Sequence, residues 1–155
     1  MKKEIVLASI LAIVLIFGAA YFAKSPSKVA NTSSVNKQEN MNNEAVNFKN
    51  LSAQDFKNLW EENKNNTNFV LLDVRTKDEF DAGHIDGAIQ LDFYSPIFAQ
   101  KLNELDKNKN YLIYCRSGNR SGQTLQLMKQ LGFKNVYNLQ YGIKSWAQAG
   151  FDLVK

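Results

Sequence analysis

Cys115 is the only cysteine among the 155 residues, and its neighbours have the chemistry to make its sulfur a nucleophile. It follows residues 111–114, a short aromatic and β-branched run that predicts a buried strand. From Ser121 to Gly132, apolar residues recur at helical spacing and predict a helix. The sequence therefore places the thiol in a tight turn between a strand and a helix N-terminus, where an anion is stabilised.

The turn after Cys115 also supplies backbone amides and permanent positive charge. Gly118 can adopt a positive φ that turns successive N–H groups inward, and Arg116 and Arg120 bring two guanidinium groups. We expect these groups to lower the pKa of the thiol, so that Cys115 can act without a histidine base. The alternative is a buried structural cysteine, since free cysteines are often buried. The two arginines and the glycine argue against that alternative.

The run Cys-Arg-Ser-Gly-Asn-Arg at residues 115–120 resembles the active-site loop of the single-domain rhodaneses, a family of sulfurtransferases. Residues 71–88 contain Leu-Leu-Asp-Val-Arg and then Gly-His-Ile, which resemble two further family signatures in the expected order. Residues 139–146 resemble the closing motif that runs from two glycines to a tryptophan, with Tyr141 in place of the first glycine. The resemblance covers about residues 44–154.

The resemblance implies a sulfurtransferase that works through a persulfide. Cys115 would be the catalytic residue, taking a sulfane sulfur from thiosulfate or a similar donor and passing it to a thiol or to cyanide. Asp73 and Arg75 would support the loop through charge-assisted hydrogen bonds. The residues that would bind the donor form the rest of the loop: Arg116, Ser117, Gly118, Asn119 and Arg120. We expect no cofactor and no metal site, since one histidine and one cysteine are too few for structural zinc.

Two other functions remain open on the sequence. The chain could be a non-catalytic module that uses the rhodanese fold to bind a partner, although inactive members of the family usually lose the cysteine that this chain keeps. Related folds also host cysteine phosphatases and arsenate reductases, whose loops have five residues between the cysteine and an arginine. Four residues separate Cys115 from Arg120 here, and Ser121 stands where that arginine would be.

Strands alternate with helices along the chain, which predicts an α/β fold with a central parallel sheet and helices on both faces. We expect strands at residues 46–51, 69–74, 88–91, 111–114 and 136–139. We expect helices after Ser52, after a capping box of Thr76 and Glu79, and at residues 96–105, 121–131 and 142–149. In such a sheet, ligands bind at the carboxyl ends of the strands, where Cys115, Asp73 and Arg75 would lie.

Residues 1–23 predict export or anchoring, because two lysines precede an uncharged apolar run at residues 5–23 that would be about 28 Å long as a helix. This segment fits either a signal peptide or an N-terminal membrane anchor. Residues 24–43 are polar and predict a disordered tether, which leaves residues 44–155 for a single rhodanese-like domain. We therefore expect an exported protein on the periplasmic or extracytoplasmic side, held to the cytoplasmic membrane only if the apolar run is not cleaved.

The expected partners are small molecules. A net charge of +4 gives no reason to expect nucleic acid, and it favours small anions only weakly. We expect a small sulfur donor and a thiol acceptor as substrates, a membrane contact only through an uncleaved leader, and a monomer.

Overall fold

The computed structural model describes residues 46–155, whose strands form one five-stranded sheet. The strands are β1 (Asn47–Leu51), β2 (Phe69–Asp73), β3 (Ile89–Gln90), β4 (Asn110–Tyr114) and β5 (Asn135–Leu139). They lie in the order β1-β5-β4-β2-β3, and every neighbouring pair is parallel. The predicted parallel α/β fold is confirmed, and the strand that leads to Cys115 lies at the centre of the sheet.

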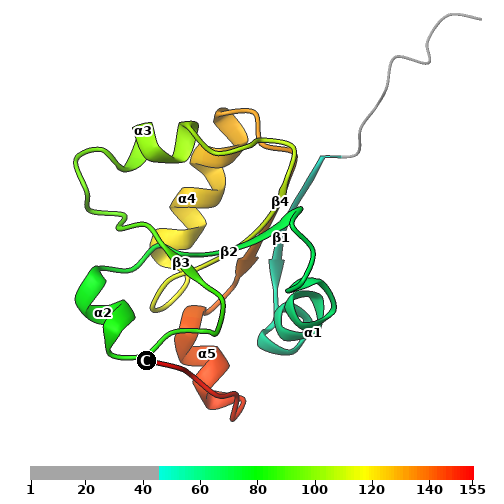
Figure 1. The fold of residues 1–155 in the computed structure, drawn as a ribbon, viewed down its shortest axis with the longest axis vertical. Helices are drawn as coiled ribbons and strands as arrows, with labels where there is room; N and C mark the ends of the chain where they lie inside the picture. The colour runs from blue at the N-terminus through cyan, green and yellow to red at the C-terminus, as the bar shows by residue number, and fades with distance from the viewer. Residues whose placement is uncertain (1–45) are drawn as a thin grey trace, which may run out of the picture. The chain divides into compact units, whose positions relative to one another are not determined.

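Helices cover both faces of this sheet (Figure 1). The helices α1 (Ala53–Asn63) and α5 (Gly142–Gln148) share one apolar core with one face. The helices α3 (Phe98–Asn103) and α4 (Asn119–Gln130) share a second core with the other face. The short helix α2 (Lys77–Asp81) buries no residue and joins neither core. The sheet is thus covered as a parallel sheet requires.

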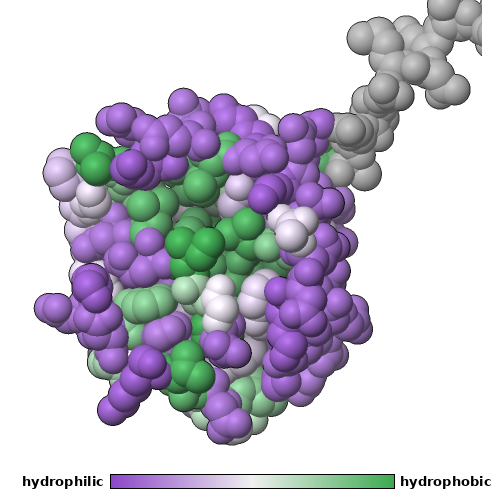
Figure 2. All heavy atoms as spheres, in the orientation of Figure 1, coloured by the Kyte–Doolittle hydropathy of each residue, from purple (hydrophilic) through white to green (hydrophobic). Residues whose placement is uncertain are grey.

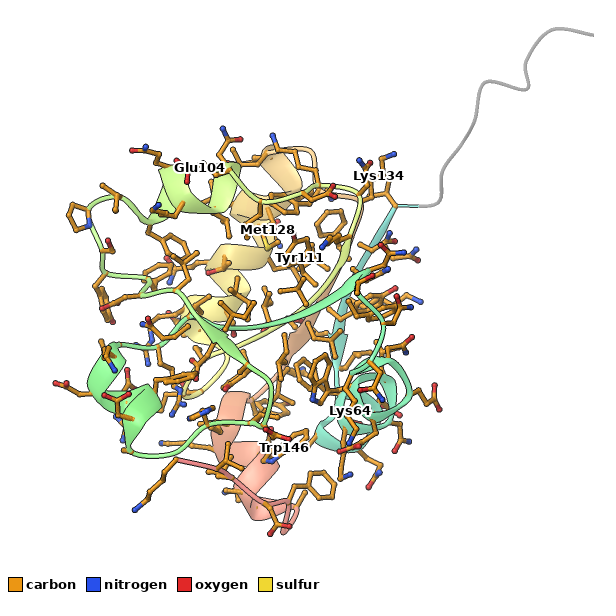
Figure 3. All side chains as sticks on the ribbon, in the orientation of Figure 1. Lys64, Glu104, Tyr111, Met128, Lys134 and Trp146 are labelled. Carbon is orange, nitrogen blue, oxygen red and sulfur yellow. The ribbon has the colours of Figure 1, made fainter. Side chains whose placement is uncertain are left out.

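The side chains of the central strand alternate between the two cores, because successive residues of a strand point to opposite faces. Tyr111 and Cys115 join the core under α3 and α4, whereas Leu112 and Tyr114 join the core under α1 and α5. These four side chains are at most 1% exposed. Figure 3 shows Tyr111 and Met128 in the layer between the sheet and α4. The alternation therefore directs Cys115 toward α4.

Local sequence signals set the starts of α1 and α2 as predicted. The Ser52 hydroxyl accepts a hydrogen bond from the amide of Asp55 at 3.2 Å and caps α1. Thr76 and Glu79 form the capping box of α2, in which each side chain accepts a hydrogen bond from the other residue's amide. The box fixes the Glu79 carboxylate in the first turn of α2, close after the carboxyl end of β2.

Two helices begin elsewhere than the sequence predicts. Helix α3 begins at Phe98 rather than at Pro96, because a turn comes first. Helix α4 begins at Asn119 rather than at Ser121, because the preceding Gly118 takes a left-handed conformation and serves as the N-cap. The turn that separates β4 from α4 is therefore shorter than the sequence predicts.

Hydrophilic side chains cover most of one face of the molecule, but apolar side chains gather at its centre over β2 and β3 (Figure 2). Ile89 of β3 is 59% exposed. Since β3 contains only two residues, it pairs with Leu72 and Asp73 of β2 and leaves the earlier residues of β2 paired with β4 alone.

Within residues 46–155, no helix is both long enough and apolar enough to cross a bilayer. The predicted leader at residues 1–23 and the predicted tether at residues 24–43 lie outside the described residues.

Candidate active site

The Cys115 side chain lies at the centre of the site, directly after the end of β4, and is 1% exposed. Its Sγ accepts a hydrogen bond from the amide of Gly118 at 3.2 Å and another from the hydroxyl of Ser121 at 3.4 Å. Gly118 is the N-cap of α4, and Ser121 belongs to the first turn of that helix. The sulfur is therefore held at a helix N-terminus, where partial positive charge favours an anion.

Helix α5 holds the carbonyl groups of the same loop. The amides of Ile143 and Lys144 donate to the carbonyl oxygens of Cys115 and Arg116, at 2.8 and 3.3 Å. Gly142 allows this close approach, because its φ is +63° and a Cβ at this position would clash with the carbonyl oxygen of Cys115. The peptide group whose carbonyl belongs to Arg116 carries the amide of Ser117, which is one of the donors to the sulfur.

A second close contact fixes the end of the loop. Gly118 has a φ of +90°, and a Cβ there would clash with the carbonyl oxygen of Gln140. Tyr141, which replaces the first glycine of the closing motif, has a φ of −112° and needs no glycine. The substitution leaves the turn intact, because the close approach to the loop falls on Gly142.

Burial raises the pKa of the Cys115 thiol, because it disfavours the charged thiolate, but hydrogen bonds outweigh this effect and hold the pKa below its ordinary value. The donors are the Ser121 hydroxyl and the amides of Ser121, Ser117 and Gly118. The sequence predicts a lowered pKa with a contribution from two guanidinium groups. In the structure, neutral hydrogen-bond donors around the sulfur are the leading cause of the lowering, and the charge of the Arg120 guanidinium also interacts with that of the thiolate.

The two loop arginines have different surroundings. The Arg120 guanidinium donates to both carboxylate oxygens of Glu79, at 2.7 and 2.8 Å, and lies 5.4 Å from the centre of the Tyr94 ring. The Arg120 side chain is only 11% exposed. Arg116 is exposed and makes no ion pair within residues 46–155. Arg120 is therefore a paired charge, and Arg116 is a solvent-facing one.

The pairing also shows in the titration of Glu79. The hydrogen bonds from Arg120 lower the pKa of this carboxyl to about 2, although partial burial opposes the shift, and hydrogen bonds from Thr76 add to it. Because this pKa is lowered, the pair contributes its full stability at any pH above the ordinary pKa of a glutamate. The contribution is lost as the pH falls through about 2, where the carboxylate becomes protonated. Glu79 is thus ionised at neutral pH.

A cavity of about 390 Å³ opens beside the loop. Its lining combines polar loop side chains with one carboxylate and one aromatic ring: Glu79, Tyr94, Arg116, Ser117, Asn119 and Arg120. A second cleft, of about 350 Å³, shares Glu79 and Arg116 with it and is otherwise lined by α5, Arg75 and residues near Leu153. Four of the five residues predicted to bind a donor line the first cavity, and the fifth, Gly118, donates to the sulfur.

A model of the rhodanese-like domain matches residues 52–149 of the chain, more than half of its length. The chain belongs to the rhodanese family. A protein named "Sulfurtransferase" from Allochromatium vinosum is 38% identical over 85 residues, which make up 55% of this chain and 78% of that protein. A protein named "Putative thiosulfate sulfurtransferase, mitochondrial" from Schizosaccharomyces pombe is 32% identical over 113 residues, covering 64% of this chain and 80% of that one. The crystal structure of a rhodanese-related protein from Thermoplasma volcanium superposes with a TM-score of 0.58 at 28% identity, over 69% of this chain and 98% of that one.

In this rhodanese domain, Asp73 and Arg75 form a buried ion pair at the end of β2. The guanidinium of Arg75 lies 2.6 Å from the Asp73 carboxylate and also donates to the carbonyl oxygen of Gly83 at 2.8 Å. The pair thereby joins the end of β2 to the turn after α2. Arg75 lines the second cleft together with Arg116. These hydrogen bonds support the neighbouring segment, and direct support of the rhodanese loop by the pair stays a prediction.

Sequence reasoning did not assign two of the residues that surround the loop. The hydroxyl of Ser121 reaches the sulfur, and Glu79 holds Arg120 across 41 positions of the sequence. A small polar residue in the first turn of a helix that follows a nucleophile is a usable signal for Ser121. Glu79 is also part of the capping box with Thr76. This local role accounts for a glutamate at this position and gives no indication of its second partner, Arg120.

Replacing Ser121 by alanine is expected to raise the pKa of the Cys115 thiol, because its hydroxyl is a leading donor among those that lower this pKa. The rate at which iodoacetamide alkylates Cys115 follows the thiolate, so the midpoint of its pH profile should move upward. Ser117→Ala is the matched control, because Ser117 acts through its backbone amide, which alanine keeps. If Ser121→Ala and the wild-type protein share one midpoint, the hydroxyl has no such role.

Gly142→Ala should destabilise the domain far more than Gly132→Ala. Both glycines have positive φ, +63° and +84°, but nothing lies within 4 Å of a Cβ at Gly132, whereas one at Gly142 would clash with the Cys115 carbonyl. We expect Gly132→Ala to lower the free energy of unfolding by about 1 kcal/mol and Gly142→Ala by about 2–5 kcal/mol, since strain and overpacking add. Urea unfolding measures both, and equal losses would show that the loop does not need the close approach of α5.

Proposed function

We propose that the chain transfers a sulfane sulfur from thiosulfate or a similar donor to a thiol or cyanide, through a persulfide on Cys115. The observation that carries this proposal is a buried sulfur that accepts hydrogen bonds from the loop and from Ser121 and has a lowered pKa. Membership of the rhodanese family and the names of the relatives support sulfur transfer in general. Thiosulfate as the donor is supported by the name of the relative from Schizosaccharomyces pombe.

In the first half-reaction, the Cys115 thiolate attacks the outer sulfur of thiosulfate. A sulfur–sulfur bond forms to Cys115, the sulfur–sulfur bond of thiosulfate breaks, and sulfite leaves with the electron pair of the broken bond. Because the lowered pKa favours the thiolate, the attack does not call for a histidine base. The amides that lower the thiol pKa are preset around the reacting centre, so they also stabilise the negative charge of the persulfide.

In the second half-reaction, an acceptor thiolate or cyanide attacks the outer sulfur of the persulfide. The bond between the two sulfurs breaks, and Cys115 leaves as a thiolate. A thiol of low pKa is a good leaving group. The hydrogen bonds from Gly118 and Ser121 therefore favour both the attack of Cys115 and its release.

The persulfide can be detected directly by intact-protein mass spectrometry after treatment with thiosulfate. We expect the mass of one added sulfur atom on the wild-type protein, its release as thiocyanate on addition of cyanide, and no addition to Cys115→Ser. The thiol of Cys115 is the only one in the chain, so the assignment is unambiguous. A wild-type protein that stays unmodified under these conditions would exclude thiosulfate as the donor.

We also propose that the domain faces the outside of the cytoplasmic membrane. The support is the sequence of residues 1–23, with two lysines before an uncharged apolar run. Because Cys115 is buried, the test uses a surface cysteine, Asn65→Cys, in the Cys115→Ser background. A maleimide that cannot cross the membrane should label this variant in cells stripped of any outer membrane. Labelling only after lysis would place the domain in the cytoplasm.

A further inference from the structure

Glu79 and Arg120 form an ion pair, and both residues line the cavity beside the loop. The guanidinium makes two hydrogen bonds, one to each carboxylate oxygen. One of these oxygens also accepts hydrogen bonds from the amide and the hydroxyl of Thr76, both at 3.2 Å. The ring of Tyr94 covers the guanidinium 5.4 Å away. Such a two-pronged pair fixes geometry as well as charge.

The pair changes the charge balance that a sulfur donor meets. Glu79 and Arg120 together carry no net charge, although both line the cavity. Arg116 lines the same cavity, is exposed, and has no ion-pair partner within the described residues. A dianion such as thiosulfate therefore meets one uncompensated cation on the loop, and not two.

We propose that Glu79 is a positioning residue that holds Arg120 in the wall of the cavity, so that Arg116 alone binds the anionic end of the sulfur donor. This inference rests on the proposed sulfur transfer and deepens it. Arg116 and Arg120, which the sequence predicts to have the same role, thus have different ones. Glu79 acts through Arg120 and has no part in the bond-making steps.

The two single substitutions should have effects of opposite sign on kcat/KM for thiosulfate. Glu79→Gln leaves the charge of Arg120 uncompensated beside the cavity, so kcat/KM should rise about two- to fivefold. Arg120→Gln leaves the carboxylate of Glu79 uncompensated, so the dianion is repelled and kcat/KM should fall by a similar factor. Glutamine at position 79 can still complete the capping box, so the first variant keeps the start of α2.

The decisive comparison is between a neutral pair and the loss of Arg116. The double variant Glu79→Gln/Arg120→Gln keeps the net charge of the pair at zero, so its kcat/KM should stay within about threefold of the wild-type value. Arg116→Gln removes the uncompensated cation and should lower kcat/KM about tenfold or more. Lys57→Gln, which removes a positive charge from a residue that lines neither cavity, serves as the control and should have no effect.

The experiment measures the rate of sulfite release in the first half-reaction at several salt concentrations, with thermal unfolding to check the fold of each variant. The double variant should keep the salt dependence of the wild-type protein, and Arg116→Gln should weaken it. A double variant as impaired as Arg116→Gln would overturn the proposal, because Arg120 would then bind the donor itself. If the double variant does not fold, the effect of Glu79→Gln alone on kcat/KM tests the proposal. A fall in kcat/KM for this single variant would overturn it. Absence of sulfite release from the wild-type protein would instead refute the proposed function, so the two failures are distinct.

Discussion

Two hydrogen bonds from the first turn of α5 to the carbonyl oxygens of Cys115 and Arg116 fix two peptide groups at the start of the loop. A peptide group points its carbonyl and its N–H in opposite directions, so the group with the Arg116 carbonyl on α5 turns the amide of Ser117 toward the sulfur. A buried thiolate is unstable unless hydrogen-bond donors replace the water that it loses. The sheet makes this possible, because β4 is its central strand and the helices α4 and α5, on opposite faces, both reach the residue that follows it.

Neutral donors and charged side chains have different main tasks at this site. The amides and the Ser121 hydroxyl act over hydrogen-bond distances and stabilise the thiolate without adding charge to the cavity. Charge acts over a longer range and depends on salt, so it suits the capture of an anionic substrate. If Arg120 were unpaired, the cavity would attract any small anion more strongly, and sulfite, an anionic product of the proposed reaction, would also leave more slowly. Pairing Arg120 with Glu79 limits this attraction to Arg116.

The parallel sheet and most of its elements could be predicted, because short apolar strands, helix caps and helical spacing are properties of neighbouring residues. The position of Cys115 at the end of a strand could be predicted for the same reason. The start of α4 could not be predicted, because its first two residues, Asn119 and Arg120, are polar and give no apolar spacing, although the sequence predicts the positive φ of Gly118. The different surroundings of Arg116 and Arg120 could not be predicted from the sequence either. Residue type and spacing give both the same charge, and only the folded chain brings Glu79 to one of them.

Burial of Cys115 fits the proposed reaction, even though substrates must reach its sulfur. A thiol that is 1% exposed is shielded from large thiols and oxidants, and the cavity lined by the loop residues that follow it is the side from which a small donor would approach. The outer sulfur of a persulfide extends about 2 Å beyond Sγ, the length of one sulfur–sulfur bond. In the proposed cycle the reactive atom therefore moves outward once it is loaded, so an acceptor too large to reach the bare thiol can still collect the sulfur. In the proposed cycle, burial of Cys115 thus sets different demands on the two substrates, because the donor must come close to the buried sulfur and the acceptor need not.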